Sequence, residues 1–104
     1  MKRVKRRYFA LQLETEGLPS EKEFMDAVWG SVTKLYGEVG ASRTSLALIN
    51  LDASRKMAIV RTSLETLDCV RASLATVTSI AGRDAAVHVL SVSGTIKALL
   101  EQVR

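Results

Sequence analysis

The chain of 104 residues contains one cysteine, one histidine and one proline. Cys69 has no partner for an internal disulfide, and no CxxC pair or cysteine–histidine cluster has the spacing of a zinc site. No apolar stretch approaches the roughly 18 residues that cross a bilayer, and the charged N-terminus is not followed by the apolar core of a signal peptide. We therefore expect a cytoplasmic protein with no membrane partner and no zinc or disulfide chemistry.

Residue types that carry catalysis are also scarce. His88, the only histidine, lies in an alternating segment beside Val87 and Val89, where a packed or partly exposed neutral ring is far commoner than a general base. Cys69 adjoins an apolar helical pattern and is most simply a core residue. The GxxxxGK[ST] spacing of a P-loop is absent. We therefore predict no catalytic residue, no metal site and no cofactor bound by the protein itself.

Positive charge is concentrated at the N-terminus. The first seven residues contain five basic residues and no acid, whereas the other 97 contain 10 basic and 11 acidic residues. A cationic segment of this kind suits the phosphate backbone of a nucleic acid, because each neutralised phosphate releases counterions whatever its base. Residues 1–6 are therefore predicted to form a basic arm on a single domain over residues 1–104, although a solvated terminus without a partner would have the same composition.

Periodicity predicts an alternation of strands and helices. The segment 7–14 alternates with period two, and Ser20 and Glu23 have the spacing of a capping box before a helix that is expected to stop at Gly37. Segments 43–51 and 56–63 are predicted to form a hairpin. Thr62 and Glu65 repeat the capping spacing before a helix expected to reach Gly82, and a strand over 86–93 precedes a C-terminal helical stripe. The apolar positions expected in the helices are Phe24, Val28, Val32 and Leu35, then Val70, Leu74, Val77 and Ala81, then Ile96, Leu99, Leu100 and Val103.

The order β-α-β-β-α-β predicts an α+β, ferredoxin-like fold with a four-stranded antiparallel sheet and an additional C-terminal helix. RNA-recognition domains share this order, but segment 55–61 has neither the glycine nor the aromatic residues of their signature. Base stacking on an open sheet is therefore not expected. The outer face of the sheet is expected to carry apolar side chains, including Ala10, Val60 and Leu90, and we predict that the C-terminal helix covers them.

The junction at residues 93–97 reads Ser-Gly-Thr-Ile-Lys, between the last strand and the last helix. Ser93 or Thr95 is suited to capping the helix, and Gly94 would permit a backbone turn that most residues avoid. Lys97 is unusual in a first helical turn, where the helix dipole favours acids. The motif is therefore open to two interpretations, simple capping and an anion site for a backbone phosphate.

Three segments together resemble the archaeal ribonuclease P protein component 2 family, whose eukaryotic counterparts are the Pop-type subunits. They are Arg6-Arg7-Tyr8, residues 37–42 (GEVGAS) and residues 92–97 (VSGTIK), of which the last is the most specific. The resemblance covers essentially the whole chain. It implies a ferredoxin-like subunit of the ribonucleoprotein that removes the 5′ leader from precursor tRNA.

In that family the RNA subunit carries the chemistry with magnesium ions, so the resemblance implies that the isolated protein is not catalytic. It also implies support of the RNA's catalytic domain, and pairing with a barrel-like protein, component 3, in an assembly with two copies of each. Two other functions stay open, a free-standing RNA chaperone and a ferredoxin-like regulatory module that binds a small ligand. For the leading hypothesis, the predicted RNA contacts are Lys2, Arg3, Lys5, Arg6, Arg7, Ser93, Thr95 and Lys97.

Overall fold

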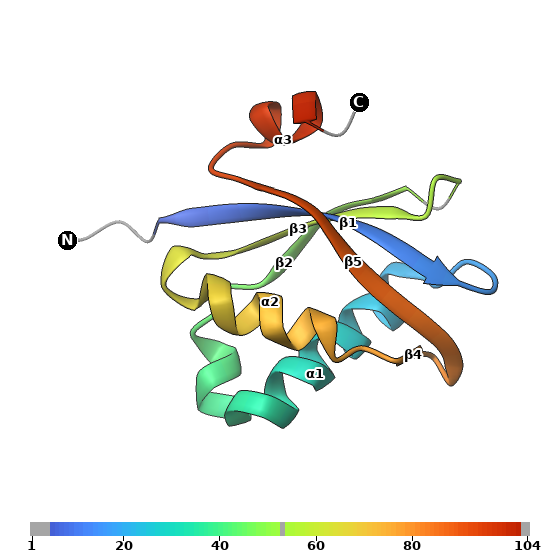
Figure 1. The fold of residues 1–104 in the computed structure, drawn as a ribbon. Coiled ribbons are helices and arrows are strands. Elements are labelled where there is room, and N and C mark those ends of the chain that lie inside the picture. Colours follow the sequence, from blue (N-terminus) through green and yellow to red (C-terminus); the bar gives the residue numbers. More distant parts are fainter. Residues whose placement is uncertain (1–4, 53, 103–104) are drawn as a thin grey trace.

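The computed structural model describes residues 5–52 and 54–102 (Figure 1). Strand β1 (Arg6–Thr15) lies at the centre of the sheet, between β3 (Met57–Ser63) and β5 (Arg83–Ser93), and is antiparallel to both. Its alternation is the one the sequence predicts: Phe9, Leu11 and Leu13 are buried on one face against the helices. The strand therefore separates a main core from a second, opposite face.

Helix α1 (Glu21–Ser42) begins at the predicted capping box. The Glu23 amide donates to Ser20 Oγ at 3.1 Å, and the Ser20 amide donates to Glu23 Oε1 at 2.9 Å. Phe24, Val28 and Val32 are buried as predicted, but Leu35 is 47% exposed. At Gly37 the backbone leaves the helical region (φ 76°, ψ 173°) and then resumes helix to Ser42. The predicted stop at Gly37 is therefore a break, after which one further helical turn follows.

The predicted hairpin is confirmed, with a shorter first strand. Strand β2 (Ala47–Asp52) pairs antiparallel with β3. The chain before it, predicted to be strand from residue 43, instead turns off the end of α1: the Thr44 hydroxyl donates to the Ala41 carbonyl at 2.8 Å, and the Thr44 amide to the same carbonyl at 3.2 Å. Thr44 is 1% exposed, so this local bonding satisfies polar groups that would otherwise be buried without partners.

The second helix is shorter than predicted and starts differently. A 3₁₀ turn (η1, Leu64–Thr66) precedes α2 (Leu67–Ala75), and the predicted capping pair of Thr62 and Glu65 does not form. Thr62 belongs to β3, and its hydroxyl donates to the Thr44 carbonyl at 2.9 Å. Ser63 precedes η1 and Thr66 precedes α2, so Thr62 occupies neither capping position.

The segment after α2 is strand rather than helix. Strand β4 (Ser79–Ile80) pairs with the start of β5 through a tight turn in which Ala81 (φ 54°) and Gly82 (φ 79°) both have positive φ. Positive φ at both central residues is the geometry of a type I′ turn, one of the two turn types that two-residue hairpins favour. Val77 is buried in the main core without being helical. Spacing alone could not separate these positions from helix, because Val77, Ile80 and Ala81 also fit a helical period.

The result is a five-stranded antiparallel sheet in the order β2-β3-β1-β5-β4. The α+β class and the element order of the other strands and helices are as predicted. The sheet has five strands rather than four because β4 is an additional, two-residue strand at its edge. Helices α1 and α2 lie together on one face of the sheet, and α3 (Ile96–Gln102) lies on the other (Figure 1).

Helix α3 covers part of the outer face, as predicted. Leu99 is fully buried in a small cluster with Ala10 and Ile59, and Tyr8 packs against it. Val60, which was also predicted on this face, lies in the main core opposite Phe9, so that prediction is wrong by one position. Val103 lies outside the described residues.

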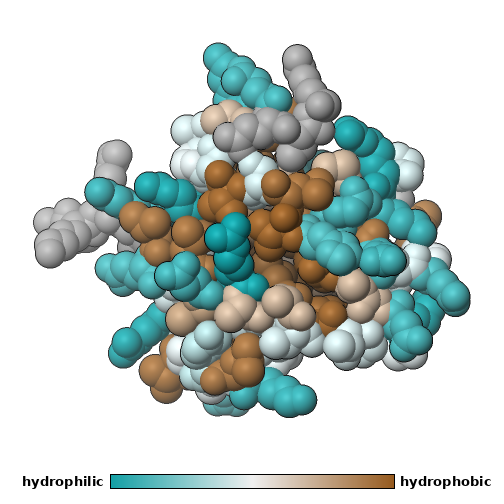
Figure 2. Space-filling model, in the orientation of Figure 1, coloured by the Kyte–Doolittle hydropathy of each residue, from teal (hydrophilic) through white to brown (hydrophobic). Residues whose placement is uncertain are grey.

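Leu90 lies where the pairing of β1 with β5 shifts register, and 48% of it is exposed. A register irregularity of this kind turns a side chain away from the face that strict alternation would give it. Figure 2 shows hydrophobic side chains gathered along β5 on the side of the molecule that faces the viewer. In the described chain, β4 pairs only with Arg83 and Asp84, so most of β5 forms an edge of the sheet.

Candidate nucleic-acid interface

The C-terminal end of the basic arm is part of strand β1. Arg6 and Arg7 are the first residues of β1 and lie opposite Ser63 and Thr62 of β3. The Lys5 carbonyl accepts a hydrogen bond from the Leu64 amide at 2.8 Å. Arg6 therefore belongs to the strand rather than to a free arm, and the predicted contacts Lys2 and Arg3 lie outside the described residues.

Hydroxyl groups at the β5–α3 junction cap the last helix. Ser93, the final residue of β5, accepts the Thr95 amide through its Oγ at 3.3 Å. The Thr95 Oγ1 accepts the Ala98 amide at 3.2 Å, and the Thr95 carbonyl accepts the Leu99 amide at 3.2 Å. Capping, one of the two interpretations of the motif, is therefore what these side chains do in the structure. Lys97 is exposed on the first turn.

Gly94 differs from its prediction. Its φ is not positive, unlike those of Gly17, Gly37 and Gly82, so the turn does not depend on a conformation reserved for glycine. Instead, the Arg7 guanidinium lies over it: a Cβ built on Gly94 would be 3.5 Å from Arg7 Nη1 and 3.6 Å from Arg7 Cζ. Arg7 Nη1 also donates to the Arg6 carbonyl at 2.9 Å. The arm and the junction, which are distant in sequence, therefore meet at one place.

Sequence reasoning missed two cationic residues at this end of the sheet. Arg61 lies on β3 directly opposite Tyr8. The Arg43 carbonyl, at the end of α1, accepts a hydrogen bond from Ser63 Oγ at 3.2 Å. An antiparallel pairing of the first and third strands was implied by the predicted fold, and its register would have placed Arg61 beside the arm. The cationic end is defined here as Lys5, Arg6, Arg7, Arg43, Arg61 and Lys97.

Carboxylates do not neutralise this end. Among residues 5–52 and 54–102, the one ion pair within 4.0 Å joins His88 Nε2 to Glu14 Oε2, at 2.9 Å. That pair lies near the other end of β1, roughly 23 Å from Arg7 at 3.3 Å per strand residue. The cationic end is thus available to an external anion, which is what a phosphate contact requires.

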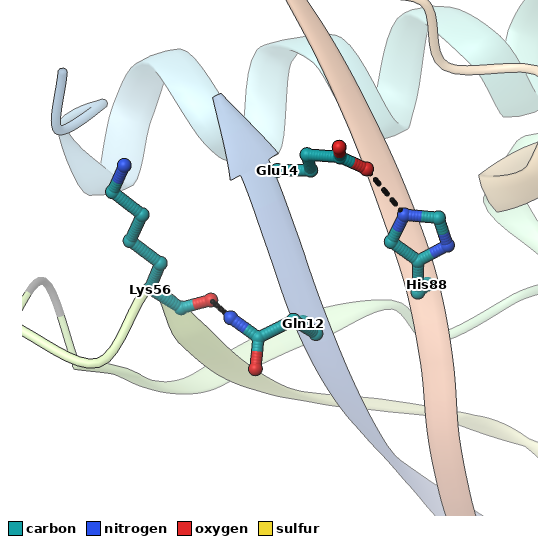
Figure 3. A network of polar contacts seen from close by, with 4 residues as sticks. All are labelled: Gln12, Glu14, Lys56 and His88. Carbon is teal, nitrogen blue, oxygen red and sulfur yellow. Dashed lines mark hydrogen bonds and ion pairs between the residues drawn. The ribbon is translucent and has the colours of Figure 1, made fainter. Parts of the chain in front are cut away.

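The opposite end of the sheet carries a separate polar network (Figure 3). Glu14 and His88 point toward one another from the adjacent strands β1 and β5, and both are largely exposed. Gln12 Nε2 donates to the Lys56 carbonyl at 3.1 Å, and Lys56 Nζ donates to the Thr15 carbonyl at 2.7 Å. His88 is therefore a partly exposed ring with one carboxylate neighbour, and no described nucleophile completes a catalytic set with it.

The remaining reactive or aromatic side chains belong to the helical layer. Trp29 packs against the main core and Cys69 is half-buried. Burial and the adjacent Cys69 thiol raise the pKa of the Tyr36 hydroxyl above its ordinary value of 10.0. Within the described ranges there is no cluster of three histidine, cysteine or carboxylate side chains that could hold a metal, and no helix is long and apolar enough to span a membrane.

Comparison with known proteins gives one consistent result. The model of the Rpp14/Pop5 family matches residues 7–104. The chain is 35% identical to ribonuclease P protein component 2 of Methanosarcina barkeri, over 96% of this chain and 73% of that protein. It is 34% identical to the component 2 of Pyrococcus furiosus, over 93% of this chain and 81% of the relative.

The chain belongs to the Rpp14/Pop5 family.

A solved structure supports the same fold for this Rpp14/Pop5 member. A chain in the cryo-EM structure of yeast ribonuclease MRP superposes with a TM-score of 0.74, covering 98% of this chain and 93% of that one at 15% identity. At that identity the likeness concerns the fold alone. The family match takes in Arg7, Gly94 and Lys97, so the place where arm and junction meet lies within the matched region.

Proposed function

We propose that this chain is the component 2 subunit of a ribonuclease P, the ribonucleoprotein that removes the 5′ leader from precursor tRNA. The observation that carries the proposal is the family match over residues 7–104, together with relatives that are named ribonuclease P protein component 2. It favours this function over a free-standing RNA chaperone and over a regulatory module for a small ligand.

The subunit acts by electrostatics rather than by chemistry. The cationic end combines basic residues from the start of β1, from β3, from the end of α1 and from α3, so that successive phosphates of a folded RNA meet several positive charges. Neutralising those phosphates lowers the concentration of magnesium ions that the RNA needs to fold. The RNA carries the cleavage chemistry with its magnesium ions, and the isolated protein is not catalytic.

The proposal includes the finer assignments of the fold and the assembly. Strands β2, β3, β1 and β5 with helices α1 and α2 form a ferredoxin-like unit, to which β4 and α3 are additions. The proposed partners are the ribonuclease P RNA and the barrel-like component 3, in a heterotetramer with two copies of each, and precursor tRNA is the substrate of the whole complex. The proposed location is the cytoplasm.

Reconstitution tests this function. The protein is mixed with an archaeal ribonuclease P RNA and component 3, and cleavage of a precursor tRNA is followed over a magnesium titration. Cleavage is expected to begin at a lower magnesium concentration than with the RNA alone or with RNA and component 3. An unchanged magnesium requirement at saturating protein contradicts the proposal. A ribonuclease P subunit should promote cleavage at the mature 5′ end of the tRNA, whereas an RNA chaperone should only unwind RNA in general. The site of cleavage therefore separates the two functions.

A further inference from the structure

Arg61 contains a polar atom that the folded chain does not satisfy. Its Nε is buried and has no hydrogen-bond partner, although the residue as a whole is only half-buried. A buried N–H without an acceptor costs folding free energy, and the cost is larger for a charged group. Such an atom is unusual in a native structure, and it calls for a physical explanation.

The position of Arg61 shows what the remaining nitrogens of its guanidinium lie beside. On the sheet face that α3 covers, Arg61 lies between Ala47 of β2 and Tyr8 of β1, and Ser93 lies beyond Tyr8 in the same row. Cross-strand neighbours of this kind have Cβ atoms about 5 Å apart. The row therefore runs from Arg61 across the aromatic ring to the end of β5, where the capped junction begins.

The surroundings favour an anion. Arg6 and Arg7 occupy the two rows that precede Tyr8 on β1, and no described carboxylate lies within 4.0 Å of the Arg61 guanidinium. The acids nearest to Arg61 in sequence are Glu65 in η1 and Asp68 in α2, and both are exposed. A single carboxylate from a protein would supply one negative charge to several cations. A polyanion such as RNA supplies a separate phosphate for each cation.

We propose that Arg61, with Tyr8 and Ser93 beside it, forms an anchoring site for one RNA phosphate at the cationic end. This inference rests on the proposed function and extends it to a residue outside the arm and the junction. Burial on the Nε side holds the guanidinium in place and removes water from part of it. Both effects strengthen its attraction for an anion that approaches its outer nitrogens.

The test compares two arginine-to-methionine variants of the full chain. Methionine keeps most of the length of the side chain and removes its charge. Arg61→Met removes the proposed anchor, and Arg71→Met removes an exposed arginine on α2, on the opposite layer of the molecule.

Binding to an archaeal ribonuclease P RNA transcript is measured at several salt concentrations. Arg61→Met is expected to weaken binding about tenfold to a hundredfold and to reduce the slope of log affinity against log salt by about 0.7 to 0.9. Arg71→Met should change neither quantity.

A second measurement separates an RNA contact from a structural role. Urea unfolding of the RNA-free protein should show Arg61→Met to be as stable as the wild type or more stable, because the substitution removes a buried N–H that has no partner. Arg61→Lys should keep the salt slope and still lose affinity, since an ammonium group cannot reproduce the planar contact of a guanidinium.

The outcomes are distinct. If the wild-type protein binds the transcript and Arg61→Met binds equally well, the anchoring site is wrong while the proposed function stands. If Arg61→Met unfolds more easily and weakens RNA binding only in proportion to the unfolded fraction, Arg61 is structural and the inference is overturned. If the wild type neither binds the RNA nor lowers its magnesium requirement, the proposed function itself fails.

Discussion

At the scale of single residues, the contact of Arg7 with Gly94 joins the first strand to the β5–α3 junction. A Cβ at this position would be in ordinary van der Waals contact with the guanidinium. Gly94 also lacks the positive φ that would require glycine, so the contact with Arg7 is what the structure shows at this position. Arg7 Nη1 also donates to the Arg6 carbonyl at 2.9 Å, so the guanidinium contacts both the strand and the junction.

The capping box of α1 makes a prediction about stability and pH. Hydrogen bonds from the backbone and side chain of Ser20 lower the pKa of Glu23 from its ordinary value of 4.5. Because the folded state favours the carboxylate, this contribution is fully present above about pH 4.5 and is lost as the pH falls through the lowered, folded-state pKa. Ser20→Ala should cost about 1 kcal/mol at pH 7, measured by urea unfolding, and the difference from the wild type should shrink at pH 3.

Glu21→Gln is the control for this experiment. Glu21 is an exposed acid in the same helical turn, but it has no part in the box. Its substitution should leave the acid limb of the stability profile nearly unchanged. A Ser20→Ala variant with the same deficit at both pH values would show that the serine hydroxyl acts alone, without the glutamate.

At the scale of elements, α1 is interrupted near its C-terminal end and α3 is a short helix. The break at Gly37 exposes apolar side chains around it, with Val39 at 70% and Tyr36 at 41%. The ψ of 173° with a positive φ is accessible essentially to glycine alone, so the break is set by that residue. Helix α3 is only seven residues long and depends on packing for its stability, since isolated helices of this length do not persist in water.

The packing of α3 predicts a contrast between two adjacent leucines. Leu99 is fully buried against Ala10 and Ile59, whereas Leu100 is 46% exposed. Leu99→Ala should lower the free energy of unfolding by about 2 to 3 kcal/mol, and Leu100→Ala by less than about 1 kcal/mol. Hydrogen exchange should show that Leu99→Ala also loses protection on the outer face of β1. Equal effects from the two substitutions would mean that α3 does not dock as described.

At the scale of the whole molecule, the two ends of the sheet differ in charge: one end is cationic, and the other carries both acids and bases. The start of β1 and the end of β3 carry the cationic end without carboxylate partners. At the other end, Glu14, Asp52 and Asp84 are mixed with Lys56 and Arg55, and hydrogen bonds from Ser54 and the Arg55 backbone hold the pKa of Asp52 below its usual range. An approaching polyanion is therefore oriented toward one end of the sheet.

This polarity predicts that position matters more than net charge. The double variant Arg6→Ala with Lys97→Ala removes two exposed cations from the cationic end, and Lys22→Ala with Arg55→Ala removes two exposed cations of the same types from the opposite end. Filter binding to ribonuclease P RNA over a salt series should show a slope smaller by about 0.7 to 0.9 for each phosphate that the first variant no longer neutralises. The second variant should keep the wild-type slope. Identical slopes would indicate attraction by net charge alone.

Local patterns were sufficient for much of this protein. Alternation over residues 7–14 and the capping box at Ser20 depend on neighbours within a few positions, so the central strand and the start of α1 could be predicted without a fold. The family resemblance likewise rested on short motifs, and the family match confirms it. Lys5, Arg6, Arg7 and Lys97 were also identified from local charge, although their contacts with RNA stay predictions.

What local patterns could not supply came from pairing between distant segments. The spacing of Val77 and Ala81 fitted a helix, but pairing with β5 made this segment a strand and a turn. Thr62 had the spacing of a cap, but it pairs with Arg7 in the sheet, and its hydroxyl donates to the buried carbonyl of Thr44. The meeting of Arg7 with Gly94, and the burial of Arg61 beside Tyr8, exist only because β1 lies between β3 and β5. Register, which depends on the whole sheet, is what brings these charges together.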